Sequence, residues 1–205
     1  MNSDSPDTNV SYMRHMKKER NTKETNIKVE VNIDGTGLVN IRTGYPFIDH
    51  LVSTFGKHSM TDINLEAKSN DKISHHLIED VAITIGQAIN NALSDRTKIS
   101  RFGYATIPMD ESVAVSSIDL IKRQYSKLSL GLARKEVEGI SKEDLEHFVE
   151  SLLQNINGCI HVYVQYGDND HHKIEAAMKA FAVAFRMAAK IDPKQTDIPS
   201  TKGVM

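Results

Sequence analysis

The pattern His-His-x-x-Glu occurs twice in the chain, at residues 75–79 and 171–175. Each copy stands where a long segment of helical apolar periodicity begins, so both are expected at the start of a helix. Positions i and i+4 lie on one face of a helix, which lets His75 and Glu79 reach a single cation. His76 is rotated by about 100° and points elsewhere, so each helix start can serve two metal ions.

A further histidine accompanies each motif, within Asp49-His50 and Glu146-His147. These pairs superimpose, as the motifs do, when the chain is shifted by 96 or 97 positions. The matched spacing indicates an internal duplication and makes chance placement of the histidines improbable. The candidate metal ligands are therefore His50, His75, His76, Glu79, His147, His171, His172 and Glu175.

Pairing these ligands across the repeat would give two sites, each with three imidazoles and one carboxylate. Such donors suit Mn, Fe, Zn, Co or Ni and disfavour Ca, so we expect two transition-metal ions per subunit. The expected combinations are His75 and Glu79 with His172, and His171 and Glu175 with His76, each completed by His50 or His147.

Helix and strand patterns alternate in the same order in both halves. The class expected is α+β, an internal duplication of two similar half-domains, each a β-sheet backed by two helices. Helices are expected near 46–58, 75–93, 141–154 and 171–190, and strands near 27–33, 38–43, 63–67, 104–108, 113–120, 125–132 and 160–164. Asp34-Gly35-Thr36-Gly37 is interpreted as a hairpin turn that pairs the first two of these strands.

The pattern divides the chain into four parts. We expect a disordered or tag-like tail at 1–12, a first half at 13–98, a second half at 99–192 and a C-terminal substrate-anchoring tail at 193–205. In that last segment Ser200-Thr201-Lys202-Gly203 combines hydroxyls, a cation and a glycine, which makes a plausible anion cradle.

The composition excludes several classes of protein. Hydrophobic residues make up 40% of the 205 and charged residues 25%, as in ordinary globular domains. The single Cys159 excludes an internal disulfide framework. A net charge of −2 disfavours a nucleic-acid binder, and no apolar run has the roughly 20 residues of a membrane helix. The polar N-terminus lacks the apolar core of a signal peptide, which favours the cytoplasm.

At these residues the chain resembles the imidazoleglycerol-phosphate dehydratases of histidine biosynthesis, from about Arg20 to Met205. The ordered matches are Arg20-Asn21-Thr22-Lys23-Glu24-Thr25, Thr43-Gly44-Tyr45-Pro46-Phe47-Ile48-Asp49-His50, His75-His76-Leu77-Ile78-Glu79-Asp80, Arg101-Phe102-Gly103, Pro108-Met109-Asp110-Glu111, Gly167-Asp168-Asn169-Asp170-His171-His172-Lys173-Ile174-Glu175-Ala176 and Pro199-Ser200-Thr201-Lys202-Gly203.

The chain departs from the family pattern in three places. The family's Asp-Leu-Ser-Gly-Arg is Asp119-Leu120-Ile121-Lys122-Arg123 here, with larger residues beside a candidate phosphate arginine. Ile73-Ser74 stands where two acids commonly precede the first His-His, and Leu77 replaces a common threonine. All eight candidate ligands remain, so the substitutions bear on the substrate loops more than on metal binding.

The resemblance implies a hydro-lyase that converts D-erythro-imidazoleglycerol phosphate to imidazoleacetol phosphate and water. Among the candidate metals it favours Mn²⁺. It also implies a homo-oligomer of 24 subunits built from trimers, with metal sites completed between subunits. Glu175 becomes the first candidate for proton transfer, with Glu79 beside the other metal and Glu24 in the substrate shell next in line. The positions that match phosphate-binding residues are Arg101, Arg123, Lys179, Ser200 and Lys202.

Two other functions use the same ligands. A dinuclear metal hydrolase would need a metal-bound water as nucleophile, and a non-catalytic transition-metal-binding assembly would follow if the Ile121-Lys122 change had destroyed the substrate loop. A nucleic-acid module on residues 13–20 is the weakest alternative, since that stretch has no interleaved aromatic residues.

Overall fold

The computed structural model describes residues 14–200. The tail expected at 1–12 and the candidate Lys202 lie outside the described residues.

The first half builds one four-stranded sheet and two helices. Its elements are β1 (His15–Asn21), β2 (Thr25–Asn32), β3 (Val39–Arg42), α1 (Pro46–Ser59), β4 (Asp62–Ser69) and α2 (Ser74–Leu93). The strand order is β1-β2-β4-β3, and β3 runs parallel to β4 whereas the other neighbours are antiparallel.

The second half repeats this arrangement. Its elements are β5 (Phe102–Met109), β6 (Ser112–Asp119), β7 (Tyr125–Ser129), the short pair β8 (Glu136–Val137) and β9 (Ile140–Ser141), α3 (Lys142–Gln154), β10 (Cys159–Tyr166) and α4 (Asp170–Ala189). The order β5-β6-β10-β7, with β7 parallel to β10, has the topology of the first sheet. The predicted α+β class with two similar half-domains is thereby confirmed.

The hairpin expected at residues 34–37 is wrong. β3 does not pair with β2 but lies beyond β4 at the other edge of the sheet. The sequence predicts both strands, but a turn-like sequence between two strands does not reveal that a third strand, later in the chain, separates them.

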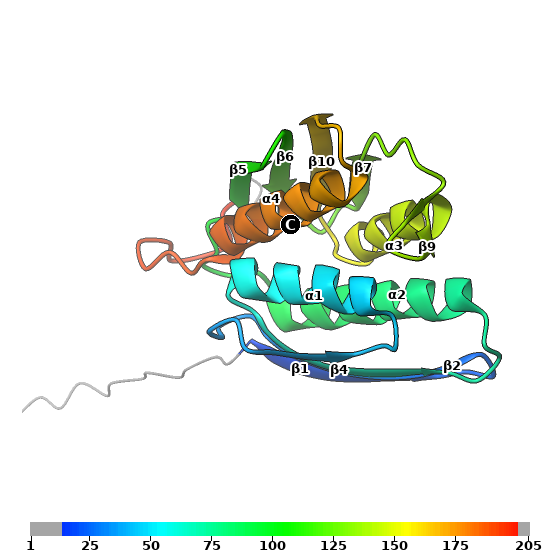
Figure 1. Ribbon diagram of the computed structural model, residues 1–205. Coiled ribbons are helices and arrows are strands. Elements are labelled where there is room, and N and C mark those ends of the chain that lie inside the picture. The colour runs from blue at the N-terminus through cyan, green and yellow to red at the C-terminus, as the bar shows by residue number, and fades with distance from the viewer. Residues whose placement is uncertain (1–13, 201–205) are drawn as a thin grey trace, which may run out of the picture.

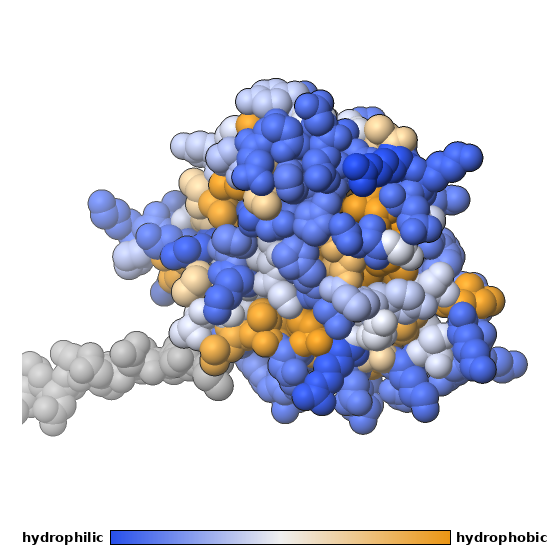
Figure 2. Space-filling model, viewed as in Figure 1, coloured by the Kyte–Doolittle hydropathy of each residue, from blue (hydrophilic) through white to orange (hydrophobic). Residues whose placement is uncertain are grey.

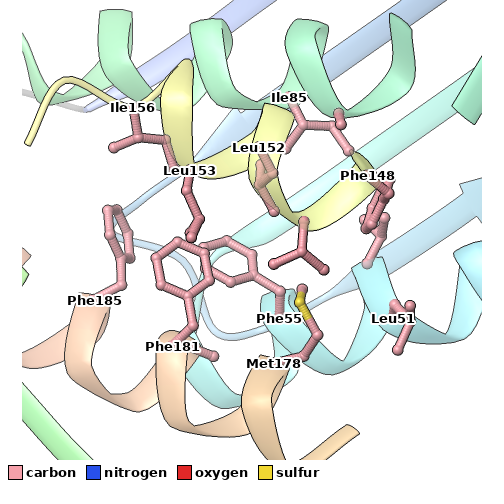
Figure 3. Packing of buried hydrophobic residues seen from close by; sticks show 14 of the residues in the cluster. Leu51, Phe55, Ile85, Phe148, Leu152, Leu153, Ile156, Met178, Phe181 and Phe185 are labelled. Carbon is pink, nitrogen blue, oxygen red and sulfur yellow. The ribbon is translucent and has the colours of Figure 1, made fainter. Parts of the chain in front are cut away.

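The four helices form the interior, and one sheet covers each side (Figure 1). α1 packs against α4 and α2 against α3, so the two halves meet helix to helix. Phe55 of α1 stacks on Phe181 of α4 with ring centroids 5.1 Å apart, and both rings are buried (Figure 3). Because the apolar faces of all four helices meet there, the core fixes where their N-terminal ends lie relative to one another.

Local signals set the helix starts. Pro46 occupies the first turn of α1, the side chain of Ser141 accepts a hydrogen bond from the Asp144 N–H at the start of α3, and Asn169 does the same for His171 at the start of α4. The candidate histidines therefore lie on or next to first turns whose positions the core fixes, with a side-chain cap in addition at α3 and α4.

The visible face in Figure 2 is mainly hydrophilic, with hydrophobic residues in limited patches. Large exposed side chains nevertheless occur on the second sheet, where Phe102 and Tyr104 of β5 and Tyr125 of β7 are exposed. Among residues 14–200 no helix is long and apolar enough to span a membrane.

Candidate metal centres and anion-binding residues

The first candidate centre joins α1 and α4 and consists of His50, His171 and Glu175. The Nε2 atoms of His50 and His171 each lie 3.3 Å from Glu175 Oε2. The ring of Phe47 packs against both imidazoles, with centroids 6.1 Å from His50 and 5.0 Å from His171. Two imidazoles from different halves of the chain thus converge on one carboxylate oxygen.

The carboxylate of this first centre is buried and charged. Glu175 is 8% exposed, and its Oε1 lies 2.7 Å from Lys179 Nζ, one turn further along α4. Burial by itself would raise the pKa of Glu175, but hydrogen bonds from Lys179 and His50 outweigh it and hold the pKa below the usual range. The side chain is therefore an anion, as a metal ligand must be.

The second candidate centre joins α2 and α3 and consists of His75, Glu79 and His147. His147 Nε2 lies 3.0 Å from Glu79 Oε1, and the rings of His75 and His147 stack with centroids 5.1 Å apart. It is the counterpart of the first centre in the duplicated fold. Each contains the first histidine and the glutamate of one motif, together with the extra histidine of the other half.

Both centres fit a transition metal by the chemistry of their donors. In each, one atom from every residue lies within 4.8 Å of the others, and two imidazole nitrogens and a carboxylate suit Mn²⁺ or a neighbouring divalent ion. Three protein ligands leave positions open for further donors.

The second histidine of each motif does not join these centres within one chain. His76 lies with Asp71 and Glu24, and His172 lies with Glu111 and Asp110. The expected combination of His172 with His75 and Glu79, and of His76 with His171 and Glu175, is therefore not formed inside one chain. The reason is the rotation noted above, which turns the adjacent side chain away from the centre.

Each imidazole at the two helix starts has a carboxylate on its Nδ1. The partners are Asp144 for His75 at 2.7 Å, Asp71 for His76 at 2.6 Å, Glu138 for His171 at 3.1 Å and Glu111 for His172 at 2.7 Å. None of these four carboxylates is predicted in this role from the sequence. Asp144 is 69 positions from His75, Glu111 is 61 from His172 and Glu138 is 33 from His171, so no local spacing could reveal these three, whereas Asp71 is only five positions from His76.

Two of these contacts shift the pKa of the imidazole and of the carboxyl group that form them. Asp71 raises the pKa of His76, and Glu111 raises that of His172. The pKa of Asp71 is lowered by the N–H of Ile73 and then by His76, and that of Glu111 is lowered first by His172. Asp71 and Glu111 are therefore ionised and act only as hydrogen-bond acceptors.

Glu24 lies in the turn between β1 and β2, beside His76, the histidine of the first motif that does not join the second centre. Its Oε1 is 3.8 Å from His76 Nδ1, and the side chain is half exposed. The backbone around it is anchored, since the Glu24 N–H donates to Thr22 and the Glu24 carbonyl accepts from the N–H of Asn70. The carboxylate is thus held in place by its backbone without being buried.

Two of the candidate phosphate residues, Arg101 and Ser200, lie near the C-terminal end of α4. Arg101 donates to both oxygens of Asp119, at 2.7 and 3.0 Å, and to the carbonyl of Pro199 at 2.8 Å, which brings it beside Ser200. Arg123 is exposed and makes no hydrogen bond or ion pair within residues 14–200. Lys179, in contrast, belongs to the first centre through Glu175.

Arg101 cannot serve the first centre of its own chain. Its N–H donates to the carbonyl of Ala188 near the end of α4, whereas Glu175 lies in the first turns of that helix. At 1.5 Å per residue the two points are about 20 Å apart. Arg101 and the first candidate centre of one chain are thus too far apart for one small molecule to touch both.

The fold and these centres define a class of protein, a duplicated α+β chain whose helix starts carry paired imidazole–carboxylate centres. The family described as imidazoleglycerol-phosphate dehydratase matches residues 43–185. The imidazoleglycerol-phosphate dehydratase of Chlorobium phaeobacteroides strain BS1 is 44% identical over 98% of this chain and 100% of its own length. That of Methanosarcina barkeri is 42% identical over 94% of this chain and all of the relative.

Solved structures agree with these sequence relatives. The Staphylococcus aureus imidazoleglycerol-phosphate dehydratase covers 87% of this chain and 99% of its own, with a TM-score of 0.78 and 29% identity. The Pyrococcus furiosus enzyme in complex with (S)-C348 covers 92% and 100%, with a TM-score of 0.77 and 33% identity. The chain belongs to the imidazoleglycerol-phosphate dehydratase family and is therefore a hydro-lyase, which confirms the resemblance drawn from its motifs.

Proposed function

We propose that the chain is a transition-metal-dependent dehydratase, with Mn²⁺ as the first candidate, that converts D-erythro-imidazoleglycerol phosphate to imidazoleacetol phosphate and water in the cytoplasm. The observation that carries the metal dependence is the pair of equivalent centres, His50 with His171 and Glu175, and His75 with Glu79 and His147. Two such centres in one chain, built from the same motif, are hard to explain as solvated surface histidines.

These centres would hold two metal ions per chain, with His76 and His172 as the remaining ligands. A bound transition metal would supply a Lewis acid that stabilises the substrate's imidazole ring in its deprotonated form. The chain's own residues orient the ring and hold the charges around it. In the first centre Lys179 and the two imidazoles keep Glu175 ionised and fixed.

The elimination also needs a group that accepts the proton from the substrate's side-chain carbon. Glu175 is a poor candidate, because both of its oxygens already have partners and its pKa is lowered. Glu79 Oε1 is likewise occupied by His147. Glu24 is exposed, anchored through its backbone and 3.8 Å from His76, so the contacts favour Glu24 as the proton acceptor and the other two as metal ligands.

A complete site would need more than one chain. The roughly 20 Å between Glu175 and the Arg101 end of α4 exceeds the span of a small phosphate ester. Arg101, Arg123, Ser200 and Lys202 would then bind the phosphate of a substrate whose ring lies on another subunit's centre. The exposed aromatics of β5 and β7 supply apolar surface for such contacts, in keeping with the 24-subunit assembly expected from the sequence.

Metal removal is therefore expected to change the particle mass. If centres are completed between subunits, a chelator should convert the large assembly to a smaller species, and added manganese should restore it. Light scattering with and without chelator measures this directly. An unchanged mass in fully metal-free protein would contradict centres that are shared between chains.

Arg123 tests the loop in which the chain departs from its family. Arg123→Ala removes a contact that would exist in both the ground state and the transition state, so KM should rise more than kcat falls. Steady-state kinetics with the phosphate ester would show it. Lys122→Ala, which alters the adjacent exposed residue, is the matched control. An unchanged KM for Arg123→Ala would mean that this loop does not bind the phosphate.

The function as a whole is tested by product analysis. Manganese-loaded protein incubated with imidazoleglycerol phosphate should form the ketone and release no inorganic phosphate. Release of phosphate would instead support the dinuclear hydrolase. Stoichiometric metal binding without any product would support the non-catalytic metal-binding assembly.

A further inference from the structure

Two loop carboxylates hold the imidazoles that stand outside the candidate centres, and they do so in the same way. Asp71 Oδ1 accepts the N–H of Ile73, in the loop that enters α2, and Asp71 Oδ2 faces His76 Nδ1 at 2.6 Å. One oxygen is thus fixed by the backbone while the other meets the ring.

Glu111 reproduces this arrangement in the second half from a different place in the sequence. Its Oε1 accepts the N–H groups of Asp168 and Asn169, in the loop that enters α4, and its Oε2 faces His172 Nδ1 at 2.7 Å. Asp71 lies just before its helix, whereas Glu111 lies in the β5–β6 turn, so the likeness is not a by-product of the duplicated sequence. Two positions that the duplication does not relate thus each place a backbone-anchored carboxylate on the Nδ1 of a histidine.

An ionised carboxylate accepts hydrogen bonds and cannot donate them. When the ring of His76 or His172 is neutral, its Nδ1 must therefore carry the hydrogen, and the lone pair is on Nε2. Carboxylates that fix a ring in this way are a general feature of histidine ligands to metals. Within residues 14–200, the acidic group nearest to His172 Nε2 is Asp110 Oδ2 at 3.6 Å, which is beyond hydrogen-bond range.

We infer that Asp71 and Glu111 are positioning residues that fix the Nδ1–H tautomer of His76 and His172, so that each Nε2 can complete a metal centre of another copy of this chain. The inference rests on the proposed metal-dependent function. It adds to that function the residues that orient the imidazoles of His76 and His172 for metal binding before two copies of the chain meet.

A third metal site made of Glu24, Asp71 and His76 is the rival interpretation. The distance between Asp71 and His76 is that of a hydrogen bond with the proton between the atoms. The same carboxylate–Nδ1 contact recurs at His172, His75 and His171, which favours orientation over a separate site.

The amide variants Asp71→Asn and Glu111→Gln give the sharpest test. In each, the amide oxygen can stay on the backbone N–H groups, so the NH₂ group turns to the imidazole Nδ1. That contact favours the hydrogen on Nε2 and removes the lone pair that a metal needs. Manganese titration calorimetry on chelator-treated protein should show about 10- to 100-fold weaker binding, whereas Glu66→Gln, an exposed carboxylate on β4, should bind like the parent chain.

A double-mutant cycle separates positioning from a merely structural role. If Asp71 acts through His76, then Asp71→Asn should weaken manganese binding no further in a His76→Ala background. Additive losses, unchanged affinity in both amide variants, or three ions per parent chain would each overturn the inference. A parent chain that binds no manganese would overturn the proposed function and this inference together.

One measurement does not depend on the folding of any variant. In metal-free parent protein labelled with ¹⁵N-histidine, at a pH where the rings are neutral, His76 and His172 should show the Nδ1–H tautomer. Spectra that place the hydrogen on Nε2 would exclude the positioning role, even if the chain binds two metal ions and is fully active.

Discussion

Glu24→Gln is expected to lower kcat by about 10²- to 10⁴-fold, the usual contribution of a general acid–base group. Glutamine keeps the size of the side chain and its place in the β1–β2 turn, where backbone bonds to Thr22 and Asn70 hold the residue. It removes the basicity that a proton acceptor needs. Because Glu24 belongs to neither the first nor the second candidate centre, manganese content should stay at the parent value.

The controls for this prediction separate chemistry from binding. Steady-state kinetics should show kcat and kcat/KM falling together, the pattern of an interaction made only in the transition state. Elemental analysis on the same sample should show unchanged metal. Full turnover in Glu24→Gln would return the proton transfer to Glu175 or Glu79, whereas metal loss would make Glu24 a ligand.

The helices could be predicted from the sequence because their signals are local. Apolar periodicity predicts three of the four, a capping signal predicts the helix at 141–154, and the structure places α2 at Ser74–Leu93 where 75–93 is expected. Ser141 was expected to begin a helix and caps α3. These features depend on residues within one or two turns of each other, which a single sequence displays directly.

Two features of the first sheet could not be predicted in this way. β1 went unrecognised because its residues are mostly charged, and Met16 is the only apolar side chain among them. β3 was paired with the wrong strand, since pairing with β4 depends on segments that α1 separates in the sequence. Strand order is a property of the whole half-domain and leaves little trace in neighbouring residues.

The candidate site likewise combines residues that a local motif predicts with contacts that it does not. The repeated motif identified His75, Glu79, His171 and Glu175, and the structure brings each pair together with a histidine of the other half. Three of the four carboxylates on the ring Nδ1 atoms could not be predicted, because contacts such as His75 with Asp144 join distant parts of the chain, and Asp71 alone is close to its histidine in the sequence. An aspartate in the first turn of a helix also has an ordinary explanation, the helix dipole, which conceals a second role.

Glu175→Gln should abolish metal binding at the first centre and lower turnover by at least 10²-fold. The amide is a neutral and weaker ligand, and the change also releases Lys179, whose Nζ lies 2.7 Å from Glu175 Oε1. An unpaired ammonium beside the centre repels a divalent cation strongly where water is scarce. Elemental analysis after dialysis should therefore give about one manganese per chain instead of two.

Glu79→Gln is the matched variant, since Glu79 has the same place in the second centre but no lysine or arginine contact within residues 14–200. It should weaken manganese binding less than Glu175→Gln does. The difference should shrink when Lys179→Met is combined with Glu175→Gln, because the apolar side chain no longer repels the ion. If the double variant binds no better than Glu175→Gln alone, the lysine is not the cause of the asymmetry. If Glu175→Gln still holds two ions, Glu175 is not a metal ligand, and the first centre must be assigned to other residues.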